Sequence, residues 1–182
     1  SVVVITINPA EMLKKTRDTK RVSDLDALRT ALNLYITDQG NLGNIVATGT
    51  GKCYTHSITS GSLNPTSGSL ASSCSSSAVS TTASQAVDGT GWIPIPFSTI
   101  TSGNPLSVLP VDPTAKLGNG ANDCGPSGWH AYVFRGNSST ANFKIMANME
   151  SGYYSASGTG DVENADGGKY SDIYEVGSDM NL

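Results

Sequence analysis

The chain has 182 residues, of which 37% are hydrophobic and only 14% are charged, and its formal net charge is −4. It contains 25 serines, 18 threonines and 20 glycines, so its polar character comes from hydroxyl groups more than from charges. This composition excludes a collagen-like repeat, a coiled-coil rod and a protein with several membrane spans. The acidic balance argues against a nucleic-acid partner, because phosphates are bound by cationic surfaces.

The first seven residues form an apolar run without any charge. The run is far shorter than the roughly 20 residues that cross a bilayer. We expect it to be the end of a longer hydrophobic segment, and a first β-strand is the alternative.

A long helix is predicted directly after this run. Asn8 suits the N-cap, Pro9 suits the first helical position, and Glu11 completes a capping box. Gly40 suits the left-handed residue that ends a helix. The helix is therefore expected from Pro9 to Gln39, a length of about 46 Å.

The apolar residues of this helix are concentrated in its second half, at spacings of three and four. The first half, up to Arg21, is nearly all polar and is expected to protrude, while the second half packs on a sheet. The predicted core between helix and sheet consists of Val22, Leu25, Leu28, Leu32, Tyr35, Ile36, Phe143 and Ile145.

Residues 41–100 are rich in Gly, Ser and Thr and predict a long irregular loop with short β-like stretches, such as residues 53–58. A disulfide between Cys53 and Cys74 would restrain this loop, although pairings with Cys124 stay open. Two prolines in residues 91–97 disfavour a central strand, so Trp92 and Phe97 are expected to pack an extended edge.

The sheet is predicted from the last third of the chain. Residues 129–135 and 142–149 are rich in β-formers or alternate in polarity, and residues 173–176 supply a third strand. The order of elements predicts the α+β class: a long N-terminal helix packed on a small antiparallel sheet, with a long irregular loop between them. Residues 1–40 would form the helical part and residues 41–182 the globular head.

Opposite charges gather at the two ends of the chain. Six of the eleven lysines and arginines lie within residues 1–29, and seven of the fifteen acidic residues lie within residues 150–182. Either copies of the chain attract one another head to tail, or the charges form two separate solvated surfaces.

The run INPAEMLKKTRDTKRVSDL at residues 7–25, with its continuation to Gly40, resembles the helix of type IV pilins and of the major pseudopilins of type II secretion. The motifs LPVDP at 109–113 and YEVG at 174–177 are similar to later landmarks of those proteins. The resemblance covers the first 40 residues closely and the remainder in patches.

The resemblance implies a structural subunit, without enzymatic activity, of a type IV pilus or a pilus-like filament. It implies a precursor inserted in the membrane, processed by a prepilin peptidase and assembled by a pilus or secretion machinery into an extracellular filament of many copies on the cell surface. Residues expected to contact neighbouring subunits are Ile5, Ile7, Met12, Leu13, Lys14, Arg17, Lys20 and Arg21.

The basic residues of the helix have two other interpretations. They could bind an anionic lipid surface beside the hydrophobic segment. Alternatively, they could be solvated and paired with Glu11, Asp18 and Asp24 on the same helix.

Catalytic chemistry is not indicated. The two histidines, His56 in a loop and His130 at a strand edge, have no nucleophile motif around them, and a surface or packing role is expected for His130. No cofactor is required, and the one candidate ion is calcium, a hard cation that prefers carboxylate oxygens. Its expected ligands, with a solvated acidic loop as the alternative, are Asp161, Glu163, Asp166 and Asp172.

The main rival to a filament subunit is a secreted carbohydrate-binding or adhesin module. Such a module stacks sugars on aromatic rings, here Trp92, Trp129, Tyr153 and Tyr154. A secreted hydrolase that uses His130 is a more distant rival.

Overall fold

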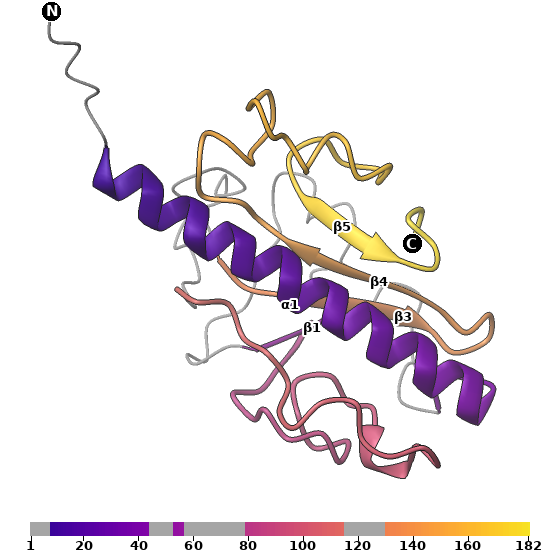
Figure 1. Cartoon of the computed structure of the whole chain (residues 1–182). Helices are drawn as coiled ribbons and strands as arrows, with labels where there is room; N and C mark the ends of the chain where they lie inside the picture. The colour runs from indigo at the N-terminus through magenta and orange to yellow at the C-terminus, as the bar shows by residue number, and fades with distance from the viewer. Residues whose placement is uncertain (1–7, 44–52, 57–78, 115–129) are drawn as a thin grey trace, which may run out of the picture.

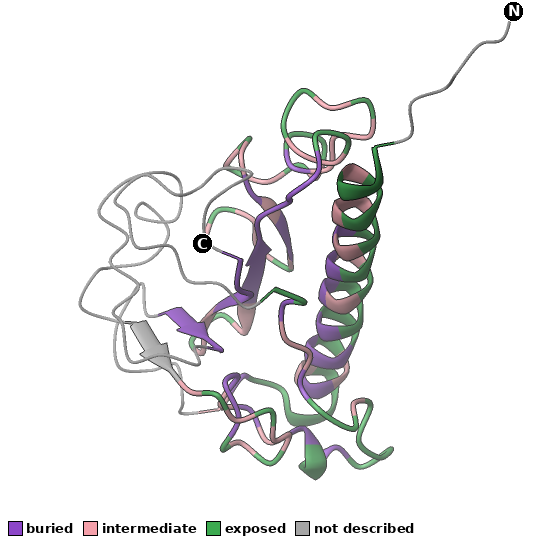
Figure 2. Cartoon of the chain, turned by 90° about the vertical axis from the view of Figure 1, so that its left-hand side faces the viewer, coloured by how far each residue is buried: buried purple, intermediate pink, exposed green. Residues whose placement is uncertain are grey.

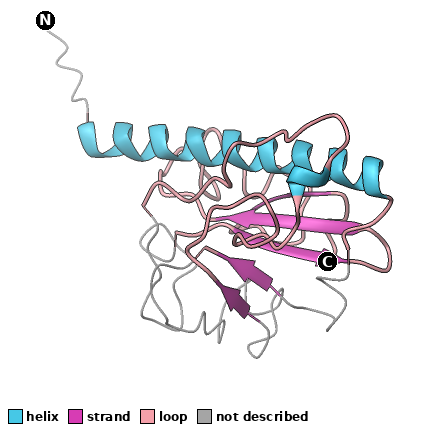
Figure 3. Cartoon of the chain, turned by 90° about the horizontal axis from the view of Figure 1, so that it is seen from below, coloured by secondary structure: helices cyan, strands magenta, loops and turns pink. Residues whose placement is uncertain are grey.

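The computed structural model describes residues 8–43, 53–56, 79–114 and 130–182 (Figure 1). One helix, α1, lies along one face of a sheet, as Figures 1 and 3 show from two directions. The expected α+β class is therefore confirmed. In chain order the elements are α1 (Pro9–Gln39), β1 (Cys53–Thr55), β2 (Val79–Thr81), the short 3-10 helix η2 (Phe97–Thr99), β3 (Val133–Asn137), β4 (Asn142–Ala147) and β5 (Tyr174–Gly177).

Helix α1 has the predicted bounds, and its ends explain them. The Asn8 side chain accepts hydrogen bonds from the backbone N–H groups of Ala10 and Glu11, at 3.2 and 3.4 Å. Gly40 adopts φ 76° and donates its N–H to the Ile36 carbonyl at 2.8 Å. The expected capping box is wrong, because the Glu11 carboxylate instead accepts the N–H of Gly152 at 2.6 Å.

Within the described residues the sheet has five strands, in the order β2-β1-β3-β4-β5. The pairs β1–β3, β3–β4 and β4–β5 are antiparallel, and β2 is added at one edge, parallel to β1. The strands β1 and β2 come from the segment 41–100, which was expected to be a long irregular loop with short β-like stretches. β1 lies within the stretch 53–58 that was expected to be β-like, whereas β2 was not expected. Both strands have three residues and form by pairing with other segments of the chain.

The core lies between the apolar stripe of α1 and the facing side of the sheet (Figure 2). The side chains of Leu25, Leu28, Leu32 and Tyr35 are buried in it, and Ile36 is half-buried against it. Val22 does not belong to this core, because the buried stripe continues from Leu25 to other residues at three- and four-residue spacing. The sheet contributes Tyr54, Phe134, Phe143, Ile145, Ala147 and Val176, and Tyr132 joins them from the position before β3.

The segment 92–100 covers the edge of this core near the C-terminal end of α1. Trp92 and Phe97 are fully buried, and the ring of Phe97 meets that of Tyr35 edge-on at 6.0 Å between centroids. The Trp92 indole N–H donates to the Pro110 carbonyl at 3.0 Å. This agrees with the packed, extended edge that the two prolines predicted.

Candidate functional site

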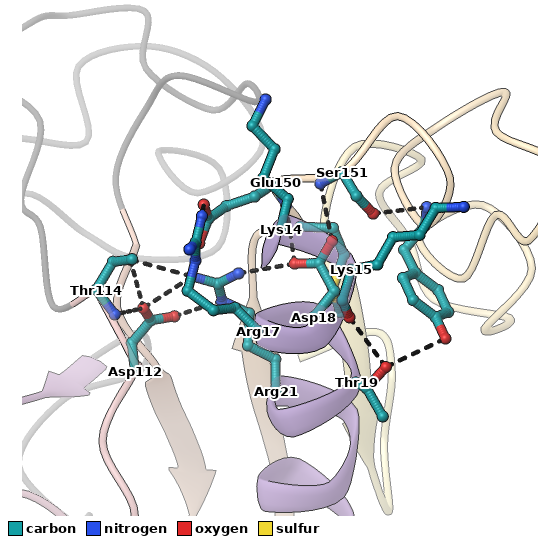
Figure 4. A network of polar contacts seen from close by, with 12 residues as sticks. Lys14, Lys15, Arg17, Asp18, Thr19, Arg21, Asp112, Thr114, Glu150 and Ser151 are labelled. Atoms are coloured by element: carbon teal, nitrogen blue, oxygen red, sulfur yellow. Dashed lines mark hydrogen bonds and ion pairs between the residues drawn. The ribbon is translucent and has the colours of Figure 1, made fainter. Parts of the chain in front are cut away.

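The N-terminal half of α1 is the candidate functional site, because it extends beyond the strands of the sheet (Figures 1 and 3). The buried stripe of the helix continues into this half with two charged residues, Arg21 and Asp18, which are both fully buried. Two loops far away in the sequence, around residues 112 and 150, reach the helix here (Figure 4).

Arg21 is the centre of a buried ionic cluster. Its Nε donates to Asp112 Oδ2 at 2.6 Å and its Nη2 to Asp112 Oδ1 at 2.9 Å, a bidentate pair. Its Nη1 donates to Asp18 Oδ1 at 2.7 Å, and its Nη2 also pairs with Glu150. A single guanidinium thus joins the helix to both loops.

The carboxylates of the cluster are themselves fixed by further donors. Asp18 accepts the backbone N–H groups of Glu150 and Ser151 at 2.9 and 2.8 Å. The Glu150 carboxylate also accepts from Arg17, with Nη2 at 2.5 Å from Oε2. Asp112 accepts the N–H and the hydroxyl of Thr114. Three carboxylates therefore share two guanidinium groups.

Ion pairing outweighs burial in the titration of this cluster. Burial alone would lower the pKa of Arg21, but its bonds with Asp112 and Glu150 raise that pKa above its ordinary value. Burial would likewise raise the pKa of Glu150, but the bonds from Arg17 and Arg21 lower it to about 2. Arg21, Asp112 and Glu150 are thus charged at neutral pH.

Both histidines lie next to this cluster. His56 Nε2 accepts the backbone N–H groups of Asp112 and Tyr132 at 3.0 and 3.1 Å, so its neutral form is the one that fits. Burial lowers the pKa of His56 to about 4. His130 is only 5% exposed, and no described residue forms a hydrogen bond with its Nδ1. His56, expected in a flexible loop, is instead a fixed acceptor that connects β3 to the 112 loop.

A second stripe of α1 contacts the loop that follows Glu150. Glu11 binds the N–H of Gly152, the Lys15 ammonium lies 4.2 Å from the ring centroid of Tyr153, and the Thr19 hydroxyl lies 3.4 Å from the Tyr154 hydroxyl. The expectation that the whole polar half protrudes is therefore wrong. Two sides of it are covered by loops of the same chain.

The third side of the N-terminal half of α1 stays exposed, and two apolar residues lie on it near the start of the helix. Met12 is 56% exposed and Leu13 is 60% exposed. The Lys20 side chain is 58% exposed and pairs with Asp24 at 3.0 Å, and Lys14 pairs with Glu11 at 3.8 Å. We call Met12, Leu13 and Lys20 the outer face of α1.

The residues expected to contact other subunits are thus divided by the structure. Met12, Leu13, Lys14 and Lys20 are accessible to a neighbour, whereas Arg17 is partly covered by its pair with Glu150. The expectation that Arg21 contacts a neighbouring subunit is wrong, because Arg21 is fully buried within the single copy. Ile5 and Ile7 lie outside the described residues.

The sequence did not indicate Asp112 and Glu150 as partners of Arg21. They lie 91 and 129 residues away from it along the chain. The available signal was the helical period itself, because the spacing that places Leu25 and Leu28 in the core also places Arg21 and Asp18 on the same stripe.

The aromatic residues proposed as a sugar platform are not gathered on one surface. Trp92 is fully buried in the core, so its assignment to a platform is wrong. Tyr153 is 36% exposed and meets Tyr154 edge-on at 4.9 Å, with Lys15 over its ring. Trp129 lies outside the described residues.

The acidic loop uses its carboxylates to hold its own backbone. Asp161 accepts the N–H groups of Ser157 and Asn164, and Glu163 accepts those of Met149 and Ala156. Asp166 accepts the N–H groups of Gly168 and Glu175. In the described part of the chain no three His, Cys, Asp or Glu residues are grouped so as to hold a metal ion. Calcium binding that involves Asp172 and its neighbours stays a prediction.

Cys53, at the start of β1, is disulfide-bonded. Its partner is not among the described residues, so the predicted pairing with Cys74 stays a prediction.

Comparison of the chain with protein-family models, with curated proteins and with solved structures gives no match. Within residues 8–43, 53–56, 79–114 and 130–182, no helix combines the length and the apolar character needed to cross a membrane.

Proposed function

We propose that this chain is a structural subunit of a type IV pilus or a pilus-like filament, which polymerises through α1. In this proposal the chain is inserted in the membrane before a pilus or secretion machinery assembles it, and the finished filament lies at the cell surface. The resemblance of residues 7–40 to pilins and major pseudopilins supports the proposal, together with the form of α1.

The observation that carries the proposal is the difference in burial between the two halves of α1. Its C-terminal half is buried on the sheet through Leu25, Leu28 and Leu32, while Met12 and Leu13 near its start are more than half exposed. Exposed apolar residues side by side favour a contact with another molecule. A contact between two different surfaces of identical copies can repeat without closing, which generates a helical filament.

The buried cluster around Arg21 gives the helix a second function in a filament. A filament subunit transmits force only if its helix α1 is held at a fixed angle to its globular head, residues 41–182. Arg21 and Asp18 fix that angle, because they bind the 112 and 150 loops through charged hydrogen bonds in a site closed to water. Breaking such buried pairs is strongly unfavourable.

The proposal is tested with the outer face in cells that produce the protein from its complete gene. The double variant Met12→Asp/Leu13→Asp places two charges where the neighbouring copy would pack. We expect sheared surface filaments that contain this chain to be lost, while the chain itself remains folded because both side chains are exposed.

Val108→Asp is the matched control. Val108 is an apolar residue on a loop after η2, and it is 56% exposed, like Met12. This variant should assemble like the parent. Filaments that form normally from the double variant, or surface fractions of the parent without this chain, would overturn the proposal.

A further inference from the structure

A second buried ion pair lies on the side of the sheet that faces away from α1. In the register of β4 and β5, Lys144 is opposite Gly177 and Met146 is opposite Glu175, so Lys144 and Glu175 are diagonal neighbours on the same face. Both side chains are fully buried. Neither side chain has a role in the filament contacts proposed above.

The two groups are close, but their geometry is not that of a hydrogen bond. Lys144 Nζ lies 2.8 Å from Glu175 Oε1, yet Oε1 has no hydrogen-bond partner among the described residues. The other oxygen, Oε2, accepts the backbone N–H of Tyr170 at 2.9 Å. Around the amine, the ring of Tyr170 lies 5.2 Å from Nζ, and the Met180 carbonyl is a distant acceptor at 3.4 Å.

We propose that Lys144 and Glu175 condense to an intramolecular amide that links β4 to β5. One proton moves from the ammonium to the carboxylate, which leaves a neutral amine beside a neutral carboxylic acid. The Nζ lone pair attacks Cδ, the bond from Cδ to Oε1 breaks, and Oε1 leaves as water with the transferred proton and a second proton from Nζ. The step needs no oxidant, reductant or co-reactant.

The two carboxylate oxygens are already differentiated for this reaction. Oε1 is the oxygen next to the amine and accepts no hydrogen bond from the part of the chain that the structure describes, which suits the oxygen that leaves. Oε2 is held by the N–H of Tyr170, which stabilises negative charge on it in the tetrahedral intermediate. After the reaction Oε2 is the amide carbonyl oxygen and keeps that hydrogen bond.

The buried site favours the amide for two physical reasons. In water the excess of solvent opposes condensation, whereas a site closed to solvent, with both side chains fully buried, holds no such excess. In addition, the amine and the carboxyl group are held together by neighbouring strands. Groups fixed in this way react as if one were present at about 10⁵ M or more.

The mass of the intact chain tests the proposal directly. Measured after denaturation and full reduction, it should be lower than the mass of the sequence by one water, about 18 Da. Proteolysis should yield one branched peptide that joins the β4 and β5 segments through Lys144 and Glu175. A mass equal to that of the sequence would overturn the proposal.

Two variants locate the lost water. Lys144→Met removes the amine and should restore the full mass, whereas Arg135→Met, at the Cα partner of Lys144 on β3, should keep the deficit. A deficit without a branched peptide, as from a succinimide at Asp166 and Gly167, would also overturn the assignment.

Discussion

At the scale of single residues, the position of Arg21 on α1 determines which loops bind the N-terminal half of the helix. The spacing of Leu25 and Leu28 places position 21 on the buried stripe, where a leucine would extend the apolar core. An arginine there requires carboxylates, and the 112 and 150 loops supply them. The pattern of the helix could predict that Arg21 is buried, but not which distant acids meet it.

Replacing Arg21 should be far more costly than replacing its neighbour. Arg21→Met fills the site but leaves Asp18, Asp112 and Glu150 buried without their shared cation, so we expect a loss of about 3–5 kcal/mol of unfolding free energy. Lys20→Met, at an exposed side chain, should change it by about 0.5 kcal/mol or less. Urea unfolding of both variants measures the difference. Equal midpoints would show that the cluster does not stabilise the fold.

His56 should make the stability depend on pH below neutrality. Its pKa is about 4 in the folded chain, against 6.5 when it is free, so between these values only the unfolded chain binds the proton. Unfolding free energy should therefore fall as the pH is lowered from 6.5 to about 4, by up to about 3 kcal/mol from this residue.

The variant His56→Gln isolates this contribution. A glutamine oxygen can accept the N–H groups of Asp112 and Tyr132 without titrating. The fall between pH 6.5 and 4 should become smaller than in the parent, while the stability at pH 7.5 changes less. An unchanged slope would assign the pH dependence to other groups.

At the scale of elements, the predictable parts are those with local signals. Asn8 and Gly40 define the ends of α1 through caps that involve only neighbouring residues. The alternation around Phe143 and Ile145 predicted β4 because its period matches a half-buried strand. By contrast, β1 and β2 have three residues each and depend on partners elsewhere in the chain. The sequence marked residues 53–58 as β-like but did not indicate the partners of β1, and β2 carries no comparable signal.

The contact between α1 and the sheet can be tested at adjacent helix positions. Leu28→Asp places a carboxylate in the apolar core, and we expect it to cost several kcal/mol, roughly 4 or more. Ala27→Asp adds the same group on the exposed side and should cost roughly 0.7 kcal/mol or less, from helix propensity alone. Thermal melting distinguishes the two. A Leu28→Asp variant that melts like the parent would mean that α1 is not held through this face.

At the scale of the whole molecule, three segments far apart in the sequence are tied to one rod. The sheet packs against the C-terminal half of α1, while the 112 loop meets it through Arg21 and the 150 loop through Asp18 and Glu11. The apolar pair Met12 and Leu13 remains accessible near the start of α1. A filament contact there would act on a helix whose direction is fixed by the entire head.

The disulfide of Cys53 should add to this whole-chain stability. The chain has three cysteines, so without reductant one thiol should react with a thiol reagent in denaturant, and three after reduction. If the partner is Cys74, the bond closes a short loop and its reduction should cost about 3 kcal/mol. Cys74→Ser should then show the same loss and Cys124→Ser should not, as measured by urea unfolding. A peptide map that links Cys53 to Cys124, with the reverse order of the two variants, would contradict the predicted pairing.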